Sequence, residues 1–460
     1  MKAVLLLLFS CCLLLLLNCK KDSFITSRDA NLLVSADTLH YDTVFTSAGS
    51  ITQAFKIIND NNRKLRLTSV QLMGGNNSSF KMNVDGVSAG QVNDIEIAAN
   101  DSIYVFVQVN IDPASGNLPF IVRDSIQISF NGNERLVQLE AWGQNAHFLR
   151  EKEVVTDEVW TNDLPYVILG YLYVAAGQNL SIEKGCRVYS HADAPIIVDG
   201  TMKVNGEKDT ANRVYFQGDR MDVPYKDFPA AWPGIYFRAS SVNNVFNNAV
   251  IKNAYQAIAA EGPATNANPK LTLNDCIIDN AYDAGIVALN SSISAFNCLI
   301  SNCGKNMALV KGGNYQFTHC TAVTIPNNFI QHRDPVLTVS NTDGTSSAAL
   351  SALFRNCIFW GESEQVEDEV IVVKSAADLV NFDHNLWKVK TIPQNVTITE
   401  NINNNSPLFD SINTSKNYYN FRLRPESPAI DKGNPVTQST TDLDGKTRLN
   451  VPDLGCFEKQ

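Results

Sequence analysis

The sequence predicts an all-β protein in which an immunoglobulin-like β-sandwich is followed by a right-handed parallel β-helix. Residues 31–147 alternate apolar and polar side chains with a period of two, which indicates strands. Further on, a short phrase built around a cysteine returns in steps of 22 residues, at Cys276, Cys298 and Cys320, and once more at Cys357. A fixed repeat in the low twenties with one strand-like phrase in each copy is typical of a solenoid.

Length and composition narrow the class further. At 460 residues the chain exceeds one compact core, so at least two units are expected. A hydrophobic content of 44% and a charged content of 18% are those of a folded protein. The formal net charge of −10 argues against nucleic acid as a partner, because such binding needs a basic surface.

The N-terminus carries an export signal. Lys2 precedes an apolar run over residues 3–17, which is short for a membrane span but suits the core of a signal peptide. We therefore predict a signal peptide over residues 1–18 and a polar tether over residues 19–30.

The end of this run, Leu-Leu-Asn-Cys19, resembles a bacterial lipoprotein signal, and the Lys-Lys-Asp that follows is similar to the export tag of Bacteroidota surface lipoproteins. The resemblance implies lipidation of Cys19, a membrane contact through the lipid chains alone, and a place at the cell outer membrane, either periplasmic or surface-exposed. A plain secretory signal is the alternative.

The sandwich is predicted from its strands and turns. Residues 102–111 and 126–130 alternate strictly, and Asn131-Gly132-Asn133 is a hairpin signal, so about seven strands are expected. The phrases 55–59 and 139–143 resemble modules of the ASPM–SPD-2–Hydin type, which implies a spacer or binding domain. Four Asp-Ser or Asp-Thr phrases resemble an O-glycosylation motif of Bacteroidota, although they also suit strand starts; they begin at Asp37, Asp42, Asp101 and Asp124.

The remaining chain divides into three predicted parts. Residues 148–165 form a charged connector, expected as a short helix that caps the open end of the solenoid. Residues 166–400 form the parallel β-helix, and residues 401–460 form its C-terminal part and cap.

Stacked coils predict ladders of equivalent residues, about 4.8 Å apart. Cysteines would face inward as a structural ladder at Cys276, Cys298, Cys320 and Cys357, while asparagines such as Asn280 would stack at the corners. Seven cysteines follow Cys19, an odd number without any C-x-x-C, so buried and reduced thiols are expected rather than a zinc site.

The end of the chain has an ordered set of phrases, Ser-Pro-Leu-Phe-Asp410, Ser-Pro-Ala-Ile-Asp431 and Asp-Leu-Gly-Cys-Phe-Glu458. It resembles the C-terminal part of the "choice-of-anchor Q" β-helix proteins, which implies a secreted or surface protein. The phrase 442–445, Asp-Leu-Asp-Gly, is interpreted as a hairpin turn because the further ligands of a calcium loop are missing.

One phrase suggests catalysis. Asp-Glu369-Val-Ile-Val-Val-Lys374-Ser resembles a strand of the alginate and chondroitin lyase family. The resemblance implies Glu369 as a ligand of Ca²⁺ and Lys374 as the base. Their offset of five residues places them on opposite faces of a strand, and no arginine occurs between Arg355 and Arg422. An ordinary strand ending in a solvated lysine is the preferred interpretation.

Other titratable groups are expected to be structural. Asp275, Asp279 and Asp283 do not converge, because the chain turns a corner within that span, and they are interpreted as solvated corner carboxylates. His319 is expected to point outward beside inward Cys320. The loop around His332 is a charged insertion, with a ligand role as the alternative.

The leading hypothesis is a non-catalytic surface lipoprotein whose β-helix binds glycans or another macromolecule. The alternatives are a polysaccharide lyase or glycoside hydrolase acting on an acidic polysaccharide, and a structural stalk or envelope component. No cofactor is predicted apart from the Ca²⁺ of the lyase resemblance. The expected partners are the membrane, reached through the lipid anchor, and a polysaccharide or surface protein.

Overall fold

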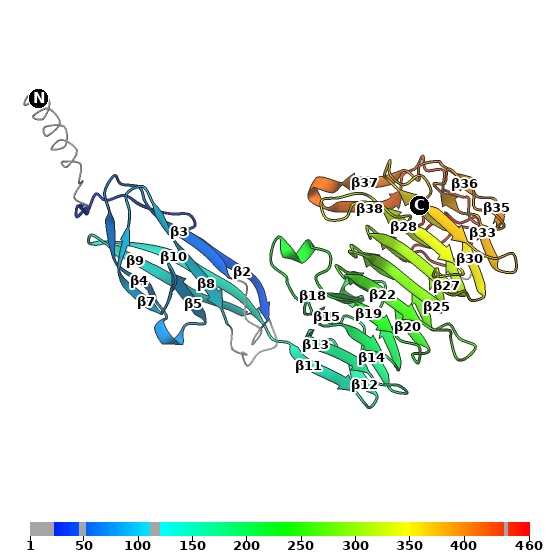
Figure 1. Ribbon diagram of the computed structural model, residues 1–460, viewed down its shortest axis with the longest axis horizontal. Helices are drawn as coiled ribbons and strands as arrows, with labels where there is room; N and C mark the ends of the chain where they lie inside the picture. Colours follow the sequence, from blue (N-terminus) through cyan, green and yellow to red (C-terminus); the bar gives the residue numbers. More distant parts are fainter. Residues whose placement is uncertain (1–22, 46–51, 111–119, 437–439) are drawn as a thin grey trace, which may run out of the picture. The chain divides into compact units, whose positions relative to one another are not determined.

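A computed structural model describes residues 23–45, 52–110, 120–436 and 440–460 (Figure 1). The chain divides into two compact units, residues 1–145 and 146–460. The predicted signal peptide, Cys19 and the first residues of the predicted tether lie outside the described residues. No helix in the part of the chain described here is long and apolar enough to cross a membrane.

The first unit is a sandwich of two sheets, as predicted, but with more strands than expected. One sheet has the order β1 (Leu32–Val34), β3 (Gln53–Asn59), β8 (Ser102–Val109), β5 (Phe80–Val84) and β6 (Val87–Ser88). The other has the order β2 (Thr38–Phe45), β10 (Asn133–Gln144), β9 (Phe120–Phe130), β4 (Leu65–Leu72) and β7 (Gln91–Ile97). A single 3₁₀ turn, η1 (Gly75–Asn77), precedes β5.

Because apolar and polar residues alternate along each strand, every second side chain points into the core between the two sheets. Phe55, Ile57, Val105 and Val107 are buried between the sheets, and the hydroxyl of Tyr41 donates to the carbonyl oxygen of Val107 at 2.6 Å. Burial raises the pKa of Tyr41, which keeps this phenol neutral.

The described part of the predicted tether, residues 23–30, is attached to the sandwich instead. The backbone N–H of Ile25 donates to the carbonyl of Lys64 at 2.8 Å, and the side-chain amide of Asn131 donates to the carbonyls of Ile25 and Ser27. Ile25 also packs against the sandwich core, and Ala30 is buried in it. The tether prediction failed for these residues because an apolar Ile in a polar stretch was read as linker.

The second unit is a parallel β-helix, as predicted, whose coils stack from β11 to β36 (Figure 1). The coils contribute strands to three faces, and the last coils, after β32, contribute strands to the first two faces only. Face 1 contains β12 (Glu158–Trp160), β14 (Asn179–Glu183), β17 (Thr201–Asn205), β20 (Asn244–Asn247), β23 (Leu271–Asn274), the C-terminal parts of β25 (Ala284–Phe296) and β27 (Lys305–Thr318), β30 (Leu350–Arg355), β33 (Leu379–Asp383) and β35 (Thr397–Thr399).

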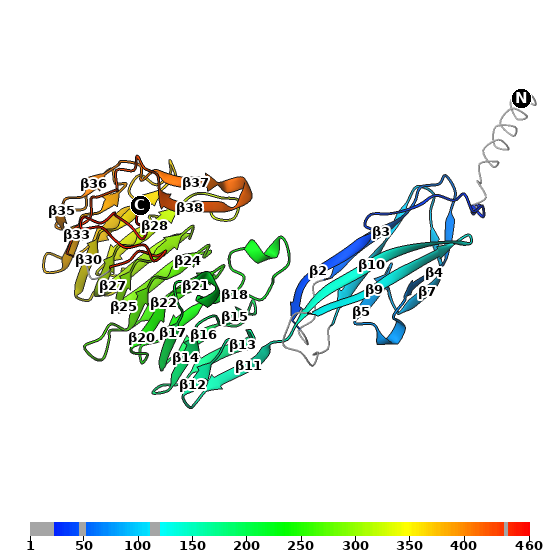
Figure 2. The ribbon, with the colours of Figure 1, turned by 180° about the vertical axis from the view of Figure 1, so that it is seen from behind.

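Face 2 follows face 1 in each coil. It contains the N-terminal parts of β11 (His147–Val154) and β13 (Tyr166–Val174), then β15 (Arg187–Ser190), β18 (Val214–Gly218), β21 (Ala249–Lys252), β24 (Ile277–Asp279), β26 (Leu299–Ser301), β28 (Thr321–Thr324), β31 (Ile358–Gly361), β34 (Leu386–Trp387) and β36 (Ile402–Asn403). Figure 2 shows β18, β21 and β24 following one another along the stack.

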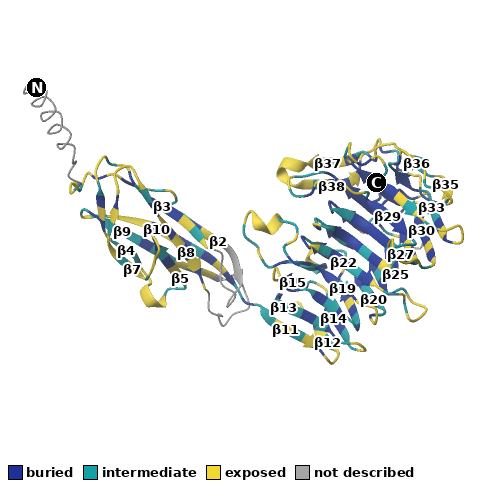
Figure 3. Ribbon diagram, viewed as in Figure 1, coloured by how far each residue is buried: buried dark blue, intermediate teal, exposed yellow. Residues whose placement is uncertain are grey.

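Face 3 closes each coil. It contains the C-terminal parts of β11 and β13, then β16 (Ile196–Val198), β19 (Ile235–Phe237), β22 (Gln256–Glu261), the N-terminal parts of β25 and β27, β29 (Leu337–Ser340) and β32 (Val370–Val373). The inward residues of the three faces form one continuous apolar core, and buried strand segments alternate with exposed loops along the stack (Figure 3).

The predicted connector is the first coil and not a helix. Its residues form β11 and β12, which pair in parallel with β13 and β14 of the next coil. The charges that suggested a connector alternate with Val154 and Trp160, which are buried in the solenoid core. A strand with one charged face satisfies the same composition as an amphipathic helix, so the charge pattern alone could not separate the two.

Corners between faces 1 and 2 use residues with left-handed backbone. Asn248, Asp275, Asn297, His319 and Asn356 occupy equivalent positions in successive coils, with φ between 50° and 55°. Apart from glycine, Asn and Asp enter this region most readily, because their short polar side chains bond locally. The recurrence of asparagine at these corners therefore follows from the left-handed backbone geometry that they require.

Directly after these corners, the cysteines lie in the core as the repeat predicts. Cys276, Cys298, Cys320 and Cys357 are fully buried and unpaired by disulfides. Burial raises the pKa of Cys276, Cys298 and Cys320 well above its usual value. At the corner between faces 2 and 3, the side-chain amide of Asn280 donates to the side-chain oxygen of Asn253 in the preceding coil at 2.8 Å, which confirms the predicted amide stacking there.

The chain ends on the outer surface of face 2. The hairpin of β37 (Phe409–Asn413) and β38 (Tyr418–Leu423) is joined by the 3₁₀ turn η4 (Thr414–Lys416). Together with the following segment it buries apolar side chains of the upper coils in a second core, which includes Leu299, Ile358, Phe421, Leu443 and Phe457.

Residues 441–458, here called the C-terminal clasp, run across the left-handed corners. The turn at 442–445 is a hairpin closed by a Thr441–Thr447 bridge, which confirms the turn interpretation. Arg448 is buried and donates to Glu458 at 3.1 Å and to the side-chain oxygen of Asn297 at 2.9 Å.

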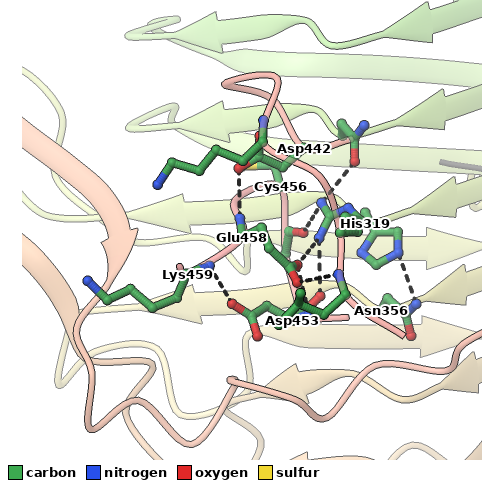
Figure 4. A network of polar contacts seen from close by, with 12 residues as sticks. His319, Asn356, Asp442, Asp453, Cys456, Glu458 and Lys459 are labelled. Atoms are coloured by element: carbon green, nitrogen blue, oxygen red, sulfur yellow. Dashed lines mark hydrogen bonds and ion pairs between the residues drawn. The ribbon is translucent and has the colours of Figure 1, made fainter. Parts of the chain in front are cut away.

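His319 points away from the coil interior but is not exposed, contrary to the expectation for an outward residue. The clasp covers it, and its Nε2 lies 3.1 Å from the amide nitrogen of Asn356 (Figure 4). Burial and the nearby Arg448 guanidinium lower the pKa of His319 well below its usual value. The sequence could not show that a segment more than a hundred residues away would cover this corner.

Candidate ligand-binding cleft

A cleft lies on face 2 where the hairpin β37–β38 stops covering the solenoid. Its main chamber has a volume of about 660 Å³. A side chamber of about 350 Å³ shares several lining residues with it, including Lys252, Asp279 and Tyr419. Hereafter the two together are called the hairpin cleft.

The floor of the hairpin cleft consists of two parallel ladders of outward residues on β18, β21, β24 and β26. One ladder is mainly apolar and runs Tyr215, Val250, Ile277 and Leu299. The other is polar and lies two positions along the same strands, running Gln217, Lys252, Asp279 and Ser301. The repeat thus sets an apolar stripe beside a polar stripe at intervals of one coil, about 4.8 Å.

Within the polar ladder, neighbours on successive coils are bonded to each other. The hydroxyl of Ser301 donates to Asp279 at 2.7 Å, and the ammonium of Lys252 lies 3.6 Å from the other oxygen of that carboxylate. Lys252 and Asp279 keep 42% and 22% of their side-chain surface exposed, so both remain accessible from the cleft.

The walls are formed by the hairpin β37–β38 and by two insertions at the corner between faces 2 and 3. The hairpin contributes Tyr418, Tyr419 and Phe421, and Tyr418 is 53% exposed. The insertions are loops 219–234 and 325–336, which contact each other through the rings of Phe228 and Phe329, with 5.0 Å between the ring centroids. The loop 219–234 contains the 3₁₀ turn η3 (Tyr225–Asp227).

Loop 325–336 is fixed by a buried hydrogen-bonded pair, His332 and Glu369. Nε2 of His332 lies 2.8 Å and 3.0 Å from the two carboxylate oxygens of Glu369, which also accepts from the backbone N–H of Val336. Both side chains are fully buried. The pair positions the loop that brings Asn327 and Phe329 to the side chamber.

The candidate lyase residues lie outside the hairpin cleft. Glu369 precedes β32 and is buried against His332, whereas Lys374 follows β32 and is half-buried, with its ammonium donating to the carbonyl of Ser375 at 2.8 Å. The structure does not bring the two together on one accessible surface. Among the described residues no group of three or more His, Cys, Asp or Glu is placed to hold a metal ion.

The three corner carboxylates lie apart, as reasoned from the sequence, but they are bonded and not merely solvated. Asp275 accepts from Lys208 at 2.8 Å, Asp279 belongs to the cleft floor, and Asp283 accepts from Gln256 at 2.7 Å and Lys305 at 3.1 Å. Burial alone would raise the pKa of Asp283, but the hydrogen bonds from Gln256 and Lys305 and the charge of Lys305 together lower it below its usual value.

Sequence reasoning missed the aromatic wall. Tyr418 and Tyr419 occur in a polar stretch that follows the last coil, and no repeat connects them with Tyr215, about two hundred residues earlier. The available signal was the pair of adjacent tyrosines in a short hairpin next to the solenoid.

Comparison with known proteins agrees with the solenoid. Residues 170–330 match the family model described as "Right handed beta helix region". No curated protein matches the chain.

Two solved structures show remote likeness. A family 123 glycoside hydrolase from Clostridium perfringens is 9% identical over 29% of this chain and 30% of its own length, with a TM-score of 0.19. The PapD-like domain 7 of human CEP192 is 9% identical over 27% of this chain and 91% of its own length, with a TM-score of 0.18. This chain therefore spans less than a third of the hydrolase, and neither likeness bears on activity.

Fold and cleft together define a right-handed parallel β-helix protein with an N-terminal immunoglobulin-like sandwich and a walled cleft on one face of the solenoid.

Proposed function

We propose that this protein is a lipid-anchored surface protein whose hairpin cleft binds a saccharide chain without cleaving it. The observation that carries the proposal is the two-striped floor. Sugar rings have apolar C–H faces and polar edges, so the stripe of Tyr215, Val250 and Ile277 suits the faces and the stripe of Gln217 and Asp279 suits the hydroxyls.

The aromatic wall supports the same ligand. Tyr418 stands exposed above the floor, and an exposed tyrosine gives a flat apolar surface with a polar tip. The ladder spacing of one coil per strand gives a polymer repeated contacts along the cleft.

Anchoring at Cys19 and a place at the outer membrane are parts of this proposal that rest on the sequence. The resemblance of the C-terminal phrases to choice-of-anchor Q proteins supports a surface location. The lyase alternative has less support, because Lys374 stands on its own outside the cleft.

The experiment is titration calorimetry of the purified mature chain against saccharides that a glycan array selects. Tyr418→Ala is expected to weaken binding about 2- to 10-fold, the range for one aromatic contact. Leu379→Ala, at an exposed residue on face 1, is the matched control and should bind as the parent does. Unchanged affinity in Tyr418→Ala, or unsaturated ends released from an acidic polysaccharide, would contradict the proposal.

A further inference from the structure

The cations of the main chamber are all bound to groups of the protein. Lys252 is paired with Asp279 at 3.6 Å, and Lys208 donates to Asp275 at 2.8 Å. Arg422 makes a two-pronged contact with Asp444, with both distances 2.7 Å. The hydrogen bonds that Arg422 donates to Asp444 raise the pKa of Arg422, which keeps its guanidinium charged.

Arg213 completes the set. Its guanidinium donates to the carbonyl oxygens of Asp275 at 3.0 Å and Leu443 at 2.9 Å, and the residue is only 6% exposed. It therefore joins the clasp to the corner and offers little surface to a ligand. Beyond the main chamber, Lys226 stands exposed at the rim beside Asp227.

An acidic saccharide would meet an unfavourable arrangement in this chamber. To bind a uronate carboxylate, Lys252 or Arg422 would have to leave its present carboxylate, and the ligand would lie beside Asp279 and Asp444. Like charges placed side by side at an interface cost several kcal/mol. A neutral sugar needs only hydrogen bonds, which Gln217, Asp279 and the tyrosine hydroxyls supply without breaking an ion pair.

We propose that the hairpin cleft selects an uncharged saccharide chain and discriminates against uronate-containing chains, because each cation of its main chamber is already neutralised or covered. This inference rests on the proposed function and specifies the ligand class of the same cleft. The uncharged ligand proposed here differs from the acidic polysaccharide that a β-helix lyase would require.

The test compares matched tetrasaccharides, hexose against hexuronate, in the gluco, galacto and manno configurations. For the configuration that binds, the neutral chain is expected to bind at least about 10-fold more tightly to the intact mature protein, equivalent to ~1.4 kcal/mol. Its affinity should change little between low and high salt, because no exposed ion pair forms.

Two variants sharpen the comparison. Asp279→Asn and Asp444→Asn remove one carboxylate each and release Lys252 or Arg422, so each should narrow the preference for the neutral chain several-fold. Thermal unfolding checks that both remain folded. Lys374→Ala lies outside the cleft and should leave the preference unchanged.

A uronate chain that binds as tightly as its neutral counterpart, or more tightly, overturns this inference and leaves the proposed saccharide binding intact. The inference is also overturned if folded Asp279→Asn and folded Asp444→Asn both keep the full preference for the neutral chain. Failure of every saccharide to bind overturns the inference and the proposed function together.

Discussion

The Sγ atom of Cys298 lies 3.6 Å from the carbonyl oxygen of Leu273, which belongs to the preceding coil. Cys320 repeats the contact with Ala295 at 3.7 Å, and Cys357 repeats it with Phe317 at 3.5 Å. Each thiol thus bridges two coils from inside, at a place where a larger side chain would not fit between stacked strands.

Thiol reactivity tests this ladder. Native protein treated with a maleimide at pH 8 should keep Cys276, Cys298 and Cys320 unmodified for hours, because burial both blocks access and raises the pKa of the thiols. In denaturant all three should react within minutes. Mass spectrometry of the peptides gives the readout, and rapid native labelling of the three would show that the coil register is wrong.

The clasp should confer a pH dependence through Asp453. Burial raises the pKa of this carboxyl to about 6, even though it accepts hydrogen bonds from the backbone of Asp431 and Lys459. The folded protein therefore holds a proton that the unfolded chain releases near pH 4. The stability contribution is fully present below about pH 4 and is lost as the pH rises to about 6, with an upper bound of ~3 kcal/mol.

Asp453→Asn should remove this slope while keeping a hydrogen-bond acceptor. The measurement is the unfolding midpoint of parent and variant from pH 3.5 to 7, and the difference between the two curves is the quantity compared. A difference that does not change with pH would contradict the prediction.

The His332–Glu369 pair should be costly to break singly. His332→Ala leaves a carboxylate buried with only the Val336 N–H and Lys388, 4.0 Å away, so we expect a loss of about 3–5 kcal/mol. The double change His332→Leu with Glu369→Met should recover much of it, because no buried charge is left unpaired.

Chemical denaturation gives these free energies. Lys184→Ala serves as the control, because its pair with Glu207 is half exposed on both sides and should change the free energy of unfolding far less than His332→Ala does. Equal losses in the single and double variants would show that the pair is merely packed against its surroundings.

Lipidation can be tested directly. Cells grown with an alkyne-labelled fatty acid should incorporate it into the parent protein, and Cys19→Ser should lose the label and move from the membrane fraction to the soluble fraction. Cys186→Ser keeps Cys19 and should retain the label. Label that persists in Cys19→Ser would refute an anchor at this residue.

Much of the architecture could be predicted because the same short sequence pattern recurs in successive coils of the solenoid. The 22-residue step placed Cys276, Cys298 and Cys320 on equivalent strands, and strict alternation gave the buried side of β8. Local geometry and local pattern determine both features. The preference of Asn for left-handed corners likewise explains the punctuation at Asn248 and Asn297.

The cleft could not be predicted, because its parts meet only through distant contacts. Tyr215 and Tyr418 lie about two hundred residues apart in the sequence and line the same chamber because the hairpin folds back on face 2. From the sequence, loop 325–336 is a charged insertion. In the structure its His332 is buried, because it contacts Glu369 on the following coil. A pairing across coils depends on how many residues each insertion adds, which periodicity does not encode.

The C-terminal clasp ties the completion of early coils to residues that are synthesised much later. Coils can stack one after another as the chain emerges, yet Lys208 donates to the carbonyl of Asp442 and Arg213 donates to that of Leu443, more than two hundred residues later. An early coil therefore keeps these donors in water until residues 442 and 443 have been synthesised and have folded back onto it. Coils that stack early thus remain only partly locked until the clasp is in place.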